Sequence, residues 1–178
     1  MPGGGPLPIP PSTVSAVAAG TLTLEGWLGK GLDDFCGKYG KAGDSFNHCA
    51  HFVSHVLGLH IPGAALCSNV DGTKYKYEDR RAGFCIRVNE VFNSCNNRDF
   101  FTAKGGTGKF LIVATIADNI ERKSPLTIGS MSKKHVGFAA DGMVYHFSNM
   151  RDVVIKQSFA EFGDHYGKKT ILLRADMP

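Results

Sequence analysis

Residues 135–148 read HVGFAADGMVYHFS, and this stretch decides the fold of the chain. Two apolar runs flank Asp141-Gly142, a dipeptide that strongly favours a two-residue β-hairpin turn. A turn at these positions pairs residues whose numbers sum to 283. His135 and His146 are therefore predicted to be diagonal neighbours on one face of two adjacent strands, within reach of each other. One imidazole could then act as a base while the other orients it.

Further strands are expected on both sides of this hairpin. Residues 110–116, FLIVATI, form the continuous apolar run of a buried strand. Two shorter apolar runs, 153–155 and 170–173, predict strands after the hairpin, and aromatic residues between them indicate a short helix near 159–166.

Residues 44–58, DSFNHCAHFVSHVLG, predict a helix of about three turns that packs on this sheet. The segment opens on good N-cap residue types and closes on Gly58. A helical wheel places Cys49 on the apolar side with Phe52 and Val53. At the first turn, backbone N–H groups and the helix dipole are expected to lower the pKa of the Cys49 thiol and make it a nucleophile.

The rest of the N-terminal half is less regular. The spacing of apolar residues over 28–39 favours an earlier helix, although its glycines weaken the pattern. Residues 62–105 are polar and predict only a short helix at 86–92, so we expect an insertion that walls one side of a cleft. With helices first and strands afterwards, the predicted fold class is α+β, with N-terminal helices packed on an antiparallel sheet.

Three histidines share the side of the 44–58 helix opposite Cys49. The wheel groups His48, His51 and His55, and we interpret them as an exposed polar stripe. His51-x3-His55 resembles the helix of zinc proteases, but that motif needs a Glu after the first histidine, where this chain has Phe52. The sequence therefore predicts no metal and no cofactor.

Composition narrows the class of protein. The 178 residues suit one domain, expected over 21–178 after a Gly/Pro-rich leader at 1–20. The net charge of +4 is not gathered into a basic face, which argues against nucleic-acid binding. No apolar run is long enough to span a membrane.

The five cysteines include no C-x-x-C pair. They leave two alternatives: one catalytic thiol with two disulfides, or buried reduced thiols.

Taken together, three short motifs resemble the NlpC-type papain-like cysteine peptidases. They are residues 49–53 opening a helix, the His-Val-Gly strand at 135–138, and residues 144–148 on the next strand, and the resemblance spans about residues 27–174. It implies a papain-like fold with Cys49 as nucleophile and His135 as base.

The resemblance also assigns the remaining candidate roles. His146 would orient His135, and the candidates for holding the oxyanion or substrate are Tyr39, Asn47 and Tyr145. The family usually has Asp before and Ser after the nucleophile, where this chain has His48 and Ala50, which leaves the triad intact and affects only the expected substrate.

The activity implied is that of an amidase or endopeptidase acting on peptide crosslinks of bacterial peptidoglycan. The start of the sequence lacks the basic segment of a secretory signal. We therefore expect a monomer made in the cytoplasm, exported as a type VI secretion amidase effector and active in the periplasm of a target cell, with a cognate immunity protein as a further partner.

Two other functions are compatible with these motifs. Residues 47–53 are also similar to the motif of lecithin:retinol-acyltransferase-like enzymes, although in those enzymes the histidine strand precedes the cysteine. The third candidate is a catalytically inactive binding module that kept the fold.

Overall fold

The structure of the protein is a computed structural model that describes residues 23–36, 48–59, 61, 64–67, 70–71, 74–75, 84–102 and 108–177. The predicted leader at 1–20 lies outside these residues, as do Tyr39 and Asn47. Within the described part of the chain, no helix is long and apolar enough to cross a membrane.

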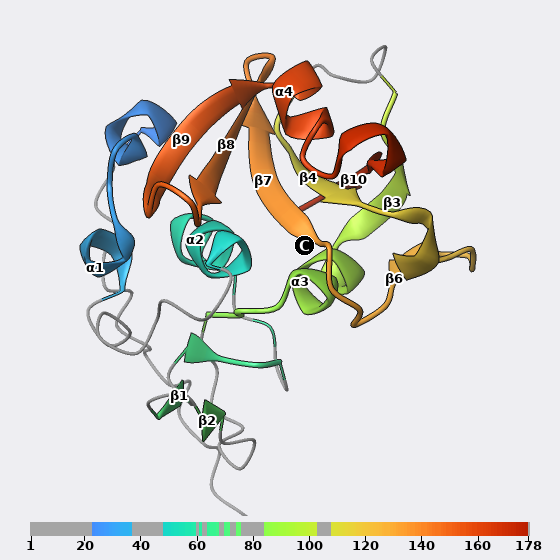
Figure 1. The fold of residues 1–178 in the computed structure, drawn as a ribbon. Helices are drawn as coiled ribbons and strands as arrows, with labels where there is room; N and C mark the ends of the chain where they lie inside the picture. Colours follow the sequence, from blue (N-terminus) through green and yellow to red (C-terminus); the bar gives the residue numbers. More distant parts are fainter. Residues whose placement is uncertain are drawn as a thin grey trace, which may run out of the picture.

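A six-stranded antiparallel sheet forms the centre of the molecule (Figure 1). In spatial order its strands are β3 (Asn96–Phe100), β10 (Ile171–Asp176), β4 (Phe110–Thr115), β7 (His135–Ala140), β8 (Met143–Ser148) and β9 (Val153–Ser158). The last strand, β10, lies between β3 and β4, so the sheet is not a simple meander. Two small strand pairs flank it: β1 (Val70–Asp71) with β2 (Lys74–Tyr75), and β5 (Ile120–Glu121) with β6 (Thr127–Ile128).

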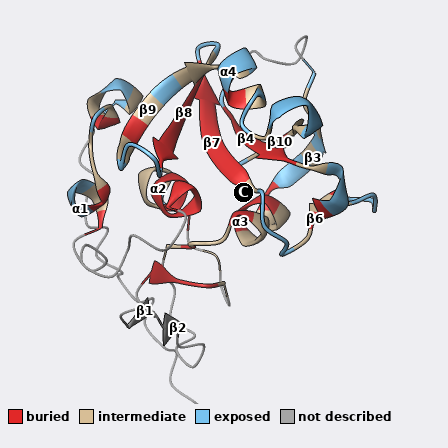
Figure 2. Cartoon of the chain, viewed as in Figure 1, coloured by how far each residue is buried: buried red, intermediate tan, exposed pale blue. Residues whose placement is uncertain are grey.

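Helices cover both faces of the sheet. The described helical elements are η1 (Leu24–Trp27), α1 (Leu32–Phe35), α2 (Cys49–Val56), α3 (Val88–Ser94), η4 (Ala117–Asn119), α4 (Phe159–Gly163) and η5 (Gly167–Lys169). The larger buried cluster joins the first three α-helices to one face, whereas Phe162 of α4 packs on the other face with Phe110 and Val144. Figure 2 shows β4, β7 and β8 buried almost throughout. The fold class is α+β, as the sequence predicts.

The hairpin of β7 and β8 has the predicted register. Asp141 and Gly142 have φ values of +52° and +77°, the left-handed conformations that such a turn needs. Phe138 pairs with Tyr145, which matches the sum of 283. Only three residue pairs next to the turn belong to this ladder, and in Figure 1 the two strands diverge toward the ends that carry the histidines. The start of α2 lies near this open end.

Several local predictions need correction. The structure shortens the 44–58 helix to the eight residues of α2, with His48 at the N-cap, and residues 44–47 lie outside the described part. The helix expected over 28–39 is the four-residue α1, because glycines surround it. The polar segment 62–105 contributes more to the core than its predicted helix at 86–92: besides Val91 and Phe92 it buries Leu66 and Cys85, and it adds the edge strand β3.

Candidate active site

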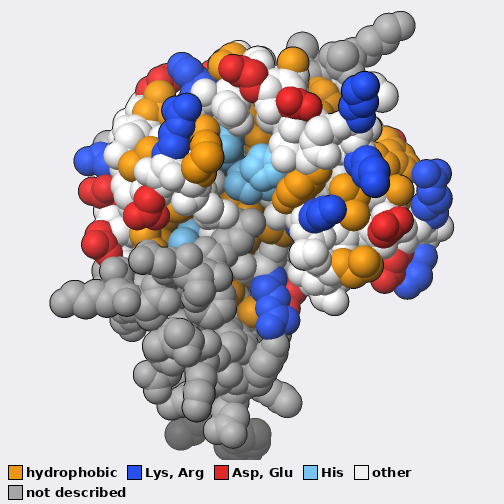
Figure 3. Space-filling model, viewed as in Figure 1, with side chains coloured by type: hydrophobic (Ala, Val, Ile, Leu, Met, Phe, Trp, Pro, Cys, Tyr) orange, Lys and Arg blue, Asp and Glu red, His pale blue; other side chains and the backbone are white. Residues whose placement is uncertain are grey.

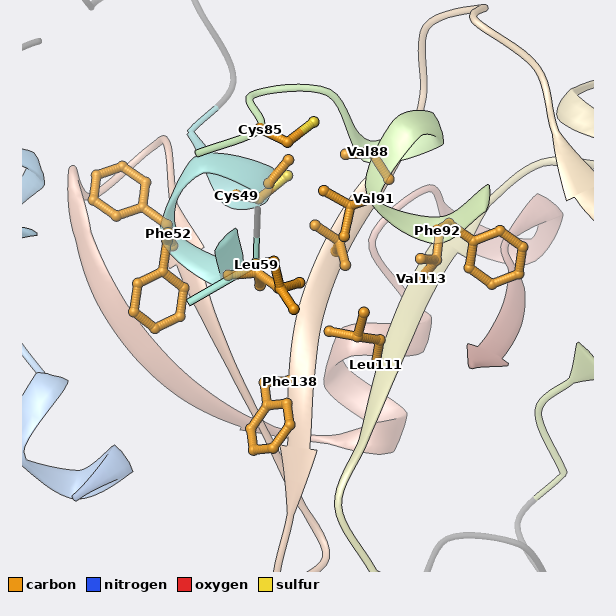
Figure 4. Packing of buried hydrophobic residues seen from close by; sticks show 14 of the residues in the cluster. Cys49, Phe52, Leu59, Cys85, Val88, Val91, Phe92, Leu111, Val113 and Phe138 are labelled. Carbon is orange, nitrogen blue, oxygen red and sulfur yellow. The ribbon is translucent and has the colours of Figure 1, made fainter. Parts of the chain in front are cut away.

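Cys49 is the first residue of α2, and its side chain is fully buried. It belongs to an apolar cluster with Cys85, Val88 and Val91, between α2 and the N-terminal end of α3 (Figure 4). The thiol also lies beside the backbone N–H of Val136 on β7. The wheel prediction that Cys49 faces the sheet is therefore confirmed.

The expected lowering of the Cys49 pKa is wrong for the structure as it stands. Burial raises the pKa of the thiol to about 12. The backbone N–H groups of Val136, Ala50 and Cys49 itself favour the thiolate, and so does the charge of Lys134, but these effects are smaller. Loss of water outweighs the helix N-terminus because a thiolate in an apolar cluster loses most of its solvation.

The two hairpin histidines meet as predicted. His135 Nε2 lies 2.8 Å from His146 Nδ1, and both rings are almost fully buried. His146 Nε2 in turn lies 2.7 Å from the side-chain oxygen of Gln157 on β9. The three side chains form one hydrogen-bonded chain that crosses three adjacent strands.

The direction of this chain fixes the tautomers. The Gln157 oxygen can only accept, so His146 donates from Nε2 and its Nδ1 carries a lone pair. His135 must then donate from Nε2, which leaves its own Nδ1 unprotonated. This Nδ1 is buried and makes no hydrogen bond. His135 is thereby held with a basic nitrogen available.

Burial also sets the charge of the pair. It lowers the pKa of His146 to about 4, although the hydrogen bond to Gln157 opposes this effect. Burial, with the nearby His146 and His165, lowers the pKa of His135 well below its usual value. Both imidazoles are therefore neutral at neutral pH.

Gly137 makes room for the pair. It lies on β7 close to β8, so an added Cβ would come within 2.5 Å of a Val144 methyl group and 3.2 Å of the His146 Cβ. A side chain there would push β8 away from β7 and lengthen the contact between the histidines. Close packing between β7 and β8 thus explains why the His-Val-Gly motif has glycine at this position.

The turn after α4 covers the outer side of the histidine pair. His165 is exposed and stacks on His135 with 4.2 Å between ring centroids. The next residue, Tyr166, is close enough to Cys49 that a thiolate would raise the pKa of its phenol, which burial already raises. Figure 3 shows histidine side chains at the surface near the centre of this face.

A groove of about 490 Å³ opens beside Lys134, at the N-terminal end of β7. Residues 86–89 line one wall and residues 130–134 the other. Arg87 and Lys134 both belong to this lining, where burial and then the charge of Arg87 lower the pKa of Lys134. The groove therefore brings positive charge close to Cys49 and suits an anionic group.

The predicted exposed histidine stripe is not exposed. His48 and His51 are buried, and His55 is half-buried. The wheel correctly groups these residues on one side of α2, but it cannot show what packs there. Phe35 from α1 and Phe84 cover that side with ring contacts to His51 and His55.

The structure does not bring every candidate residue to this site. Tyr145 shares the larger core cluster with Cys49, but its side chain lies on the opposite face of the sheet from His146 and its hydroxyl donates to Glu25 at 2.6 Å. The other two candidates for holding the oxyanion or substrate lie outside the described residues. All five cysteines are buried free thiols.

Three residues near the site were missed from the sequence. Gln157 lies on β9 two residues beyond Ile155, the partner of His146, so a predicted register for that strand pair would have found it. Lys134 comes directly before His135 in the sequence, and this position next to a candidate catalytic residue was the available signal. His165 has no sequence signal, because its contact with His135 depends on how α4 folds back.

Comparison of the chain with protein-family models, curated proteins and solved structures found no match. The class that fold and site define is an α+β domain with a buried cysteine at a helix start and a buried histidine pair on the adjacent hairpin.

Proposed function

We propose that the protein is a papain-like cysteine amidase or endopeptidase of the NlpC type, acting on peptide bonds in bacterial peptidoglycan. The observation that carries the proposal is the hydrogen-bonded chain from Gln157 through His146 to His135, which leaves His135 Nδ1 as a base. Its neighbour Val136 adjoins the Cys49 thiol at the start of α2.

Cys49 Sγ and His135 Nδ1 share no hydrogen bond in this structure, so the proposed reaction begins when substrate binding brings the two atoms together. The thiol then transfers its proton to His135 Nδ1 and attacks the amide carbonyl. The backbone N–H groups that lie beside the thiol, from Ala50 and Val136, are candidates to stabilise the charge on the carbonyl oxygen. Collapse of the tetrahedral adduct breaks the C–N bond, and the amine leaves with the proton from His135. Water then attacks the thioester, with His135 again as base, and releases the carboxylic acid and the free thiol.

The groove beside Lys134 supports an anionic peptide as substrate. Its cationic lining residues are Arg87, Lys133 and Lys134, and such side chains bind carboxylates by charge-assisted hydrogen bonds. Stem peptides of peptidoglycan carry free carboxylates close to their crosslinks. Export as an effector and control by an immunity protein would follow from this activity and belong to the same proposal.

The test is incubation of purified muropeptides with wild-type protein, Cys49→Ala and Cys95→Ser, followed by mass analysis of the fragments. We expect wild type and Cys95→Ser to release the same new amines, because Cys95 is a buried thiol elsewhere in the core that donates a hydrogen bond to the Val91 carbonyl. Cys49→Ala should release none while remaining folded. Transfer of a labelled acyl chain to Cys49 with muropeptides untouched would instead support the acyltransferase.

A binding module without catalysis is favoured by one observation. Cys49 is fully buried and its pKa is raised to about 12, which is unusual for a working nucleophile. A thiol-reactive probe applied to the folded protein distinguishes the two functions. Labelling of Cys49 that accelerates when muropeptides are added supports the hydrolase, since substrate would then open the site. A thiol that stays inert while muropeptides bind supports the module.

A further inference from the structure

A second constellation lies on the other side of α2. Cys36, His51, His55 and Cys67 each direct one ligand atom to the same place, and these four atoms all lie within 4.8 Å of one another. The residues come from three segments: the end of α1, two successive turns of α2, and the short stretch at 64–67. None of them takes part in the hydrogen-bonded chain around His135.

We propose that these four residues form a structural zinc site of the Cys2His2 type. This inference is independent of the proposed hydrolase activity. Two thiolates and two imidazoles are the donor set that tetrahedral Zn²⁺ prefers, and the spacing His51-x3-His55 on one helix lies in the range seen in such sites.

The distances fit this geometry. Zn–S bonds of about 2.3 Å and Zn–N bonds of about 2.0–2.1 Å give a tetrahedron with edges of about 3.3–3.8 Å. The edge from Cys67 Sγ to His55 Nε2 is already 3.7 Å. The remaining pairs lie within 4.8 Å, so any pair of ligand atoms needs to approach by at most about 1.5 Å. Small rotations of side chains supply such a movement.

Burial explains why a metal is needed here and what kind of site it is. Cys36, His51 and Cys67 are buried and His55 is half-buried, with Phe35 and Phe84 packed around the imidazoles. Four protein ligands leave no position for a substrate, which is typical of a structural rather than a catalytic site. Binding displaces one proton from each thiol, so the charges of Zn²⁺ and two thiolates cancel within the apolar surroundings.

The competing chemistry is a disulfide between Cys36 and Cys67. Its formation would require an oxidant to remove two electrons and two protons. The two imidazoles would then have no metal ion to coordinate. The two outcomes differ in mass, because zinc binding adds one metal ion and removes two protons, whereas the disulfide only removes two hydrogen atoms.

The experiment is native mass spectrometry and elemental analysis of the full chain, produced with zinc and purified in reducing buffer. We expect one zinc per chain. Replacement of zinc by cobalt should give the visible bands of tetrahedral Co²⁺ together with a thiolate-to-cobalt charge-transfer band. Cys36→Ser should lose most of the metal and weaken that band. Cys95→Ser and Cys49→Ala should keep both, because their thiols lie outside the cluster.

The proposed zinc site would be contradicted if wild-type protein stayed metal-free when zinc is added after reduction. It would also be contradicted by a Cys36–Cys67 disulfide that takes up no metal once it is reduced. An unchanged cobalt spectrum in Cys36→Ser would contradict it as well. If Cys36→Ser does not fold, the zinc stoichiometry and the cobalt spectrum of the wild-type protein test whether the site exists. Cys49→Ala separates the two proposals, since it should abolish hydrolysis and keep the zinc.

Discussion

His146 makes the folded protein sensitive to mild acid, and the size of the effect follows from its pKa. Burial lowers that pKa from 6.5 to about 4. Below pH 6.5 His146 binds a proton in the unfolded chain but stays unprotonated in the folded chain. Stability is therefore lost as the pH falls from about 6.5 to about 4, and this group causes no further loss below that range.

The magnitude comes from the same two values. One pH unit corresponds to about 1.4 kcal/mol for one differential proton, so His146 alone lowers the free energy of unfolding by about 2 kcal/mol between pH 7 and pH 5. His146→Gln removes this titration while its amide can still accept the hydrogen bond from His135. We expect its stability to fall less steeply with acid than that of wild type.

The assay is urea denaturation of both proteins at a series of pH values between 7 and 5. The difference between their slopes is the quantity to measure, because other buried histidines, including His51 and His135, contribute to both curves in the same direction. His165→Gln is the control, since this exposed ring should change the slope less. Equal slopes for wild type and His146→Gln would refute the reasoning that His146 is buried and neutral.

Three further substitutions test the surroundings of the site. Gly137→Ala should destabilise the fold by about 1–3 kcal/mol in urea denaturation, because its Cβ would come within 2.5 Å of Val144; unchanged stability would contradict the close packing of β7 and β8. Gln157→Leu should lower kcat about tenfold with little change in KM, as expected for the loss of one orienting hydrogen bond; an effect on KM alone would indicate substrate binding instead. Tyr145→Phe should leave turnover unchanged and reduce thermal stability slightly, since its hydroxyl contacts only Glu25 among the described side chains; lost turnover would return Tyr145 to the site.

The hairpin was predictable because local chemistry determines it. Asp141-Gly142 adopts the left-handed conformations that a tight turn requires, and the turn then fixes which residues face each other. That register puts His135 and His146 on one face as diagonal neighbours, and they meet although the ladder covers only the three pairs next to the turn. The position of β10 between β3 and β4 was not predictable, because chain order does not determine the order of strands in a sheet. The charged edge strand β3 was missed for a related reason: its exposed residues lack the apolar pattern of a strand.

The burial of His51 shows a different limit. A helical wheel reports which residues share a side, and it correctly separated Cys49 from the histidines. It does not report what covers that side, and here the cover comes from Phe35 and Phe84, which belong to other segments of the chain. The thiol pKa was misjudged in the same way, since the helix terminus is a local feature and desolvation is not.

The proposed active site and the proposed zinc site both depend on the stability of α2. An eight-residue helix is too short to be stable by itself, so tertiary contacts must hold it. On one side Phe52 and Val53 pack in the core, as a helix of this kind requires. On the other side His51 and His55 supply little apolar area, and buried polar groups stabilise a structure only when they have partners. Shared coordination of these imidazoles would add to their ring contacts with Phe35 and Phe84. It would also fix the first turn of α2, and with it the position of Cys49 relative to His135.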